Sequence, residues 1–151
     1  SDFSDLSLWV AGEFWDDVNR YRRLAQDHHL ENRVHIEPEF LPEEALALRL
    51  AACDGVLLPY RSATGSGVLG STYAAGRPVI ATRTGCFREM VIPGQTGLLC
   101  EPGDADSLAQ AIREFYQGEG PKRFQAGVAQ VSQKFSWEGI SSAVEELLHG
   151  R

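Results

Sequence analysis

The sequence lacks the features of a nucleic-acid-binding or membrane-spanning protein. Its 14 lysine and arginine residues are outnumbered by 21 aspartate and glutamate residues, which gives a formal net charge of −7 at pH 7. Nucleic-acid binding depends on clustered basic residues, and here they are scattered, so we expect no nucleic-acid partner. No apolar run approaches the ~20 residues that cross a bilayer, so we expect no transmembrane segment.

Cysteine is scarce, with only Cys53, Cys86 and Cys100. An odd number at irregular spacing makes neither a disulfide framework nor a pair of zinc knuckles. The 4 histidines also lack metal-ligand spacing, among themselves or with the cysteines. We therefore expect a reducing, cytoplasmic setting, and neither a metal nor a cofactor.

The chain is otherwise ordinary in composition, with 151 residues of which 43% are hydrophobic and 23% charged. These values are typical of a folded globular protein, and the length is that of one domain. We therefore expect a single domain over residues 1–151 with one core. Trp9, Trp15 and Trp137 are expected to pack in that core rather than stack on a sugar or base.

Short apolar runs alternate with segments whose apolar residues recur every three or four positions, which predicts alternating strands and helices. Two of the runs, Val56-Leu57-Leu58 and Val79-Ile80-Ala81, are apolar on both faces, as in a parallel sheet covered by helices on both sides. The sequence therefore predicts a doubly wound, Rossmann-like α/β domain ending in C-terminal helices. The expected strands are 6–11, 33–36, 55–60, 78–82 and 97–101, and the expected helices are 14–29, 42–50, 67–75, 104–115, 124–135 and 140–148.

The strongest chemical signal is Thr64-Gly65-Ser66-Gly67, between a strand and a helix at the ligand-binding edge of such a sheet. Glycines let the backbone approach a ligand, and free N–H groups at a helix start bind anions, so we expect a phosphate or diphosphate site. The alternative is that the glycines only turn the chain. Gly65, Gly67 and Gly70 also match a dinucleotide-binding pattern, but the next strand ends in Thr82-Arg83 instead of an acidic residue. A dinucleotide-dependent oxidoreductase is thus a minor alternative.

A longer set of motifs resembles a known family. Pro59, the glycine-rich turn, Ala74-Ala75-Gly76-Arg77-Pro78-Val79-Ile80-Ala81-Thr82, Gly85, Glu89 and Gly94-Gln95-Thr96-Gly97-Leu98-Leu99 occur in this order. Together they resemble the C-terminal domain of glycosyltransferase family 4, a GT-B type family. The similarity runs from about Leu8 to the C-terminal helices.

The resemblance implies a retaining transfer of a sugar from a nucleotide diphosphate sugar to an acceptor. It implies that this domain holds the donor, that a separate N-terminal domain holds the acceptor, and that the loop matching residues 60–69 wraps the sugar and the diphosphate. No catalytic residue is assigned. The donor-binding candidates, from the resemblance and from their place at the strand ends, are Gly12, Glu13, Tyr60, Arg61, Thr64, Gly65, Ser66, Gly67, Val68, Leu69, Ser71, Arg83 and Glu89.

The sequence departs from the family in two glutamates that normally lie eight positions apart around this loop. One alignment places Ala63 and Ser71 there, and the other places Thr64 and Thr72. A neutral Ser71 would replace a carboxylate that binds the donor ribose. Two interpretations follow: an altered grip on the donor, or a non-catalytic interaction module.

The chain also begins at what resembles the family's second strand, near Leu6. The resemblance therefore implies a domain truncated at its first strand and helix, and without the acceptor domain. We expect little or no turnover from the chain alone, because transfer needs both sites closed on each other. An uncovered sheet edge is expected to favour oligomers.

Overall fold

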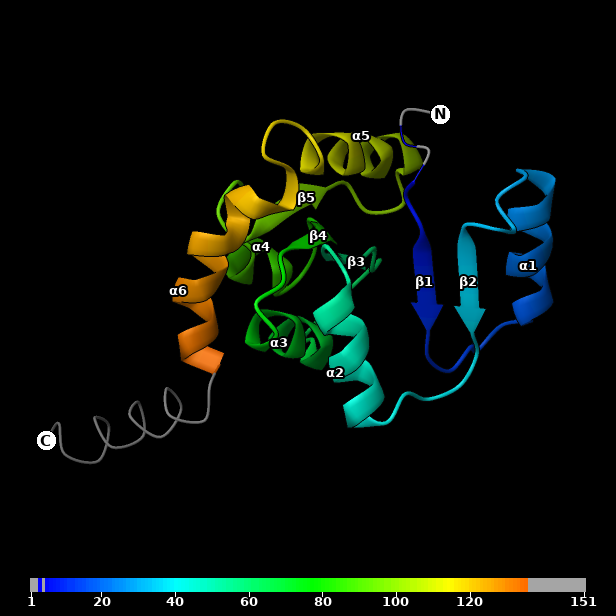
Figure 1. The fold of residues 1–151 in the computed structure, drawn as a ribbon, viewed down its shortest axis with the longest axis horizontal. Helices are drawn as coiled ribbons and strands as arrows, with labels where there is room; N and C mark the ends of the chain where they lie inside the picture. The colour runs from blue at the N-terminus through cyan, green and yellow to red at the C-terminus, as the bar shows by residue number, and fades with distance from the viewer. Residues whose placement is uncertain (1–2, 4, 136–151) are drawn as a thin grey trace, which may run out of the picture. The chain divides into compact units, whose positions relative to one another are not determined.

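The computed structural model describes residue 3 and residues 5–135, and it divides the chain into two compact units, Ser1–Leu46 and Ala47–Arg151. Both units are built from parallel strands and helices that alternate along the chain (Figure 1), which confirms the predicted α/β class. The elements in chain order are β1 (Leu8–Ala11), α1 (Val18–Asp27), β2 (Val34–Glu37), α2 (Glu43–Ala52), β3 (Val56–Leu58), α3 (Gly67–Ala74), β4 (Val79–Thr82), α4 (Phe87–Met90), β5 (Gly97–Cys100), α5 (Ala105–Phe115), η1 (Gly120–Phe124) and α6 (Gln125–Phe135).

The first unit is a two-stranded parallel sheet with one crossover helix. β1 pairs with β2 in the register Leu8↔Val34 to Ala11↔Glu37, and α1 connects the two strands. Asp17 caps α1, because its side chain accepts a hydrogen bond from the Asn19 N–H at 3.0 Å. None of the described residues of this unit is buried.

The expectation that the tryptophans pack in the core is wrong for both that the structure describes. Trp15 lies between β1 and α1 with 98% of its surface exposed, and Trp9 on β1 is 49% exposed. Trp9 stacks instead on His35 of the neighbouring strand, with ring centroids 4.4 Å apart. The physical reason is that a two-stranded sheet with one crossover helix encloses no interior large enough for an indole. Trp137 lies outside the described residues.

The second unit contains a three-stranded parallel sheet in the order β3-β4-β5. The β4–β5 pair requires glycine at position 97, because a Cβ there would lie 2.0 Å from the Val79 carbonyl oxygen. The core around this sheet contains Tyr73, Phe87 and Phe124, each 0% exposed.

Tyr73 carries a polar group into this core. Its hydroxyl donates to the Met90 carbonyl oxygen at 3.2 Å and lies 2.9 Å from the Thr96 hydroxyl. Thr96 in turn accepts from the Ile92 N–H at 2.9 Å. Burial raises the pKa of the Tyr73 hydroxyl. The network thus ties α3 to the segment that leads into β5.

The five strands begin and end within two residues of the expected ones, and the helices follow the expected order. α1 begins later than expected because Asp17 takes the cap position. α4 has no counterpart among the expected elements, since four residues are too few for a helical period. The expected helix 140–148 lies outside the described residues.

Candidate functional site

The glycine-rich stretch leaves β3, passes through residues 59–66 and enters α3, as expected. Ser66 is the N-cap of α3: its backbone is extended (φ −142°), and its hydroxyl accepts a hydrogen bond from the Leu69 N–H at 3.2 Å. The Ser66 carbonyl oxygen accepts from the Gly70 N–H at 3.4 Å. The helix therefore begins inside the glycine-rich segment.

The segment carries backbone N–H groups that can act as donors. Within the part of the chain that the structure describes, no atom accepts a hydrogen bond from the N–H of any residue from Thr64 to Val68. Successive free N–H groups at a helix start carry partial positive charge and bind anions. The arrangement can therefore hold a phosphate or diphosphate through backbone donors.

The surface above these donors is open. Thr64, Gly65, Gly67 and Val68 are exposed, and Ser66 is half-buried. A Cβ built on Gly65 or Gly67 would meet nothing within 4 Å, and neither glycine has a left-handed φ. The protein itself therefore does not need glycine at these two positions, whereas a ligand that approaches the backbone closely does.

The side chains after these donors separate into accessible and buried ones. Leu69 is 0% exposed, and its N–H donates to the Ser66 hydroxyl, so the row of free donors ends at Val68. Thr72 is 0% exposed, and its hydroxyl donates to the Val68 carbonyl oxygen at 2.6 Å. Ser71 is exposed, and it is the accessible hydroxyl of the two that could replace the family's second glutamate.

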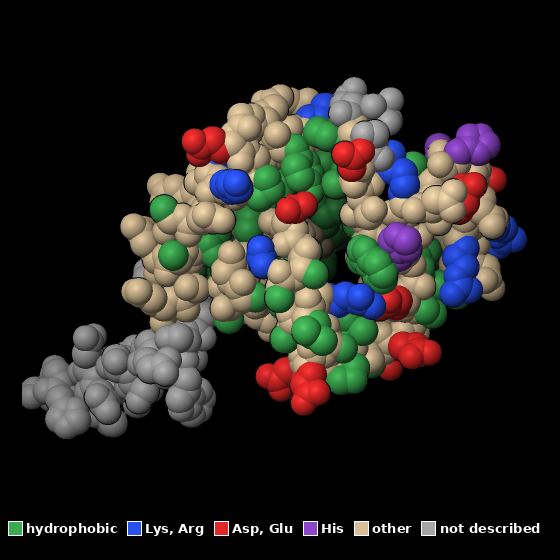
Figure 2. All heavy atoms as spheres, in the orientation of Figure 1, with side chains coloured by type: hydrophobic (Ala, Val, Ile, Leu, Met, Phe, Trp, Pro, Cys, Tyr) green, Lys and Arg blue, Asp and Glu red, His purple; other side chains and the backbone are tan. Residues whose placement is uncertain are grey.

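The charged candidates at the same end of the sheet follow β3 and β4. Arg61 is exposed, and Arg83 donates from Nε to the Glu101 Oε1 atom at 3.1 Å, with both side chains about half exposed. Arg88 on α4 donates from Nε to the Arg83 carbonyl oxygen at 3.0 Å, and Glu89 is exposed on the same helix. The structure thus brings Arg83 and Arg88 together. On the face drawn in Figure 2, basic side chains of the described residues are interspersed with acidic ones.

The remaining candidates, Gly12 and Glu13, belong to the first unit and follow β1. Gly12 has a left-handed φ of +131°, which favours glycine. Glu13 lines a hollow of about 310 Å³ together with Phe14, Trp15 and Pro38. Sequence reasoning placed Phe14 in a candidate ligand-binding loop, residues 12–14, but it did not connect Trp15 and Pro38 with a site. The two aromatic residues directly after Gly12-Glu13 were the available signal.

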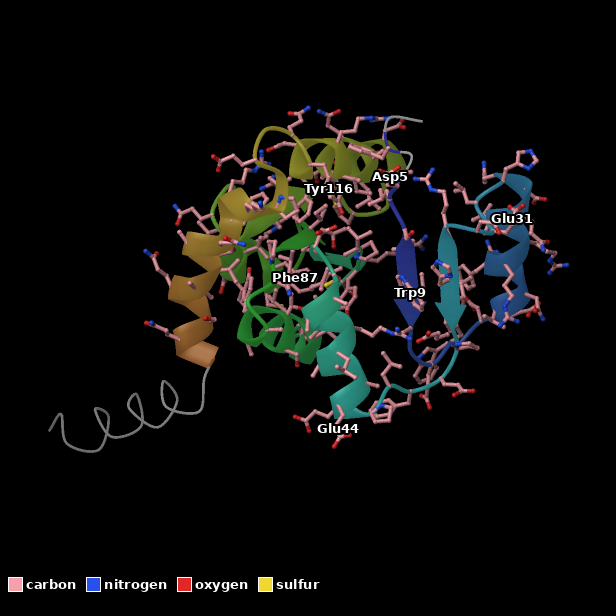
Figure 3. All side chains as sticks on the ribbon, in the orientation of Figure 1. Asp5, Trp9, Glu31, Glu44, Phe87 and Tyr116 are labelled. Atoms are coloured by element: carbon pink, nitrogen blue, oxygen red, sulfur yellow. The ribbon has the colours of Figure 1, made fainter. Side chains whose placement is uncertain are left out.

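Among the described residues, the groups with a shifted pKa lie outside residues 59–68. Burial raises the pKa of Cys53 and of Cys100. Burial, together with the neighbouring Asp54 carboxylate, raises the pKa of Tyr116 to about 12. Tyr116 follows α5 (Figure 3), and its hydroxyl donates to Asp54 Oδ2 at 3.3 Å. Within the described residues, no group of three or more histidine, cysteine or acidic side chains is placed to hold a metal.

Comparison with known proteins supplies the family. The model of the family described as glycosyl transferases group 1 matches residues 1–118. The chain belongs to this family. It is 34% identical over 139 residues to an uncharacterized glycosyltransferase, MJ1178, of Methanocaldococcus jannaschii, which covers 87% of this chain and 39% of that protein. It is 31% identical over 149 residues to a glycogen synthase of Mycobacterium tuberculosis, which covers 93% of this chain and 34% of that protein.

Solved structures agree with the family assignment. Anabaena Alr3699/HepE, solved in complex with UDP and glucose, is 25% identical, with a TM-score of 0.79 over 96% of this chain and 41% of that one. The similarity confirms the expected GT-B, Rossmann-like class. The chain thus spans 34% to 41% of the length of these two relatives and this structure. Among the described residues, no helix is long and apolar enough to cross a membrane.

Proposed function

We propose that this chain is the nucleotide-sugar-binding part of a retaining glycosyltransferase, which transfers a sugar from a nucleotide diphosphate sugar to an acceptor. The observation that carries the proposal is the row of free N–H groups from Thr64 to Val68 at the start of α3. Two comparisons support it. The chain belongs to the glycosyl transferases group 1, and a structural neighbour was solved with UDP and glucose.

The proposed mechanism is electrostatic. As the bond between sugar and diphosphate breaks, negative charge grows on the leaving diphosphate. Preoriented N–H groups and the positive end of the α3 dipole stabilise that charge without reorganising. Arg61 is exposed beside them and adds a positive charge, and Arg83 adds a second once it exchanges Glu101 for the ligand. The proposal thus assigns the stabilisation of this charge to backbone and arginine donors, and it includes no metal or cofactor.

The finer contacts remain part of the proposal. The accessible Ser71 hydroxyl is assigned to the donor ribose as a neutral partner, which is weaker than the family's carboxylate. Glu89 is assigned to the sugar side of the site. Gly12 and Glu13, in the first unit, stay donor-binding predictions from the sequence, and Glu13 lines the aromatic hollow after β1.

The activity of the whole protein needs an acceptor site, which we assign to a separate domain. The relatives and structural neighbours are larger than this chain, which is consistent with such a domain. We keep the cytoplasmic setting as a proposal that rests on the cysteine content alone. A non-catalytic interaction module is the second candidate, favoured by the absence of carboxylates at Ala63, Thr64, Ser71 and Thr72.

Calorimetric titration of the chain with UDP, GDP and their glucose derivatives tests the proposal, with NADP as the rival ligand. We expect saturable binding of one nucleoside diphosphate and of its sugar derivative, and none of NADP. Binding of NADP alone would favour the oxidoreductase alternative. No binding of any of these ligands would overturn the donor site and favour the interaction module.

A further inference from the structure

We propose that the β4–α4 turn, taken here as residues 82–86 and including the last residue of β4, positions the glycine-rich loop, residues 59–66, and that Gly85 is the residue on which this positioning depends. Two separate observations carry the inference: a row of hydrogen bonds from this turn to the loop, and a close backbone approach that only glycine allows. The role in anion binding rests on the proposed function. The positioning itself is a property of the fold and can be measured without a ligand.

Three hydrogen bonds tie the loop to this turn. The Thr82 hydroxyl, on the last residue of β4, donates to the Tyr60 carbonyl oxygen at 2.5 Å. The Thr84 hydroxyl donates to the Arg61 carbonyl oxygen at 3.4 Å, and the Cys86 N–H donates to the Ala63 carbonyl oxygen at 3.2 Å. Every acceptor is a backbone carbonyl that precedes the row of free N–H groups. These bonds therefore fix the peptide planes that lead into the anion-binding segment.

Gly85 brings the two backbones together. A Cβ at this position would lie 1.5 Å from the Ala63 carbonyl oxygen and 2.6 Å from the Ala63 carbonyl carbon. Its φ of +46° is in the left-handed region as well. Both obstacles to a side chain are backbone features, which no rotamer change relieves. A side chain at position 85 would push Ala63 away and break the bond from Cys86.

The turn is itself anchored in the core. Phe87, directly after it, is 0% exposed and lies inside the second unit (Figure 3). Its ring contacts that of Tyr60, with centroids 5.3 Å apart. Thr82 is 2% exposed and lies within the β4 ladder. The turn therefore transmits the rigidity of the sheet to the loop, which is what keeps a binding segment in place before its ligand arrives.

Gly85→Ala tests the inference, and Gly94→Ala is its matched control. Gly94 has a left-handed φ of +78°, so an alanine there carries similar backbone strain, but its Cβ would meet nothing within 4 Å. The first readout needs no ligand. Trypsin cleaves after Arg61, an exposed residue of the loop, and mass spectrometry follows the Arg61–Ser62 bond. We expect Gly85→Ala to raise this cleavage rate about tenfold, and Gly94→Ala to leave it unchanged.

A second, milder pair of variants, at Thr82, keeps the inference testable if Gly85→Ala does not fold. Thr82→Val removes the hydroxyl at nearly constant volume, and Thr82→Ser keeps it. We expect faster cleavage at Arg61 with valine and near-normal cleavage with serine. The second readout is the Kd for UDP or GDP, measured well below the melting temperature of each variant. We expect Kd to rise about tenfold in Gly85→Ala and in Thr82→Val only.

The outcomes distinguish a failure of the positioning role from a failure of the proposed function. Equal cleavage at Arg61 in Gly85→Ala and Gly94→Ala, with Thr82→Val unchanged, would overturn the positioning role whether or not a nucleotide binds. Faster cleavage with unchanged Kd would overturn the positioning of an anion site. Failure of the original chain to bind any nucleoside diphosphate would instead refute the proposed function, and the cleavage rates would still decide the role of the turn.

Discussion

Gly67→Val tests whether glycine at position 67 is required for folding or for ligand binding. Gly67 is the first residue of α3, its φ is not left-handed, and an added Cβ would meet nothing within 4 Å. Valine is slightly better than glycine in a helix, so the free energy of unfolding should change by about 0.5 kcal/mol or less. The same side chain covers N–H groups that we assign to the diphosphate. Loss of one hydrogen bond to a charged group costs about 1.5–3 kcal/mol, which weakens binding by about tenfold or more.

The assay pairs urea unfolding with titration of the nucleoside diphosphate that binds the original chain. Ala74→Val is the matched control, because Ala74 is the exposed last residue of the same helix, six residues after the last of the free N–H groups. We expect the control to bind normally and Gly67→Val to bind poorly, although both remain folded. Normal binding by a folded Gly67→Val would refute the assignment of the anion site to the start of α3.

Two further predictions concern the core and the opposite end of the sheet. Tyr73→Phe removes a hydrogen-bond partner from the Met90 carbonyl and from the buried Thr96 hydroxyl, so the free energy of unfolding, measured in urea, should fall by about 1–3 kcal/mol. An unchanged free energy of unfolding would mean that the network does not stabilise the fold. The folded state raises the pKa of Tyr116 to about 12, above its ordinary value of about 10. The contribution of this hydroxyl to the free energy of unfolding should therefore be fully present below pH 10 and be lost as the pH rises toward 12. The free energy of unfolding of Tyr116→Phe should fall less over that range. A parallel decline in both proteins would contradict the raised pKa of Tyr116.

The main features of the fold could be predicted because the strands carry an unambiguous pattern. Val56–Leu58 and Val79–Thr82 are apolar on both faces, and such strands need helices on either side of a parallel sheet. The start of α3 was predictable from the serine and glycines that precede it, since Ser66 is a strong N-cap. These are local features, and local sequence is sufficient to predict them.

The structure was needed wherever distant segments meet. Nothing in Gly85 reveals that the Ala63 carbonyl fills the space of its missing side chain, because the two residues are brought together by neighbouring strands. The buried hydroxyl of Thr72 and the pairing of Arg83 with Glu101 are likewise visible only in three dimensions. The exposed Trp15 shows the reverse case, in which a strongly apolar residue lies outside any core. Its place beside Glu13 and Pro38 points to a surface hollow instead.

The most direct test of the central idea follows backbone amides by nuclear magnetic resonance while UDP or GDP is added to the isotopically labelled chain. An N–H that donates to phosphate changes its environment strongly, so we expect the largest shifts at residues 64–68. The amide of Leu69, already donated to Ser66, should move less. Saturable binding with these five amides unmoved, or no binding by either nucleotide, would contradict the assignment of the glycine-rich loop as the diphosphate site.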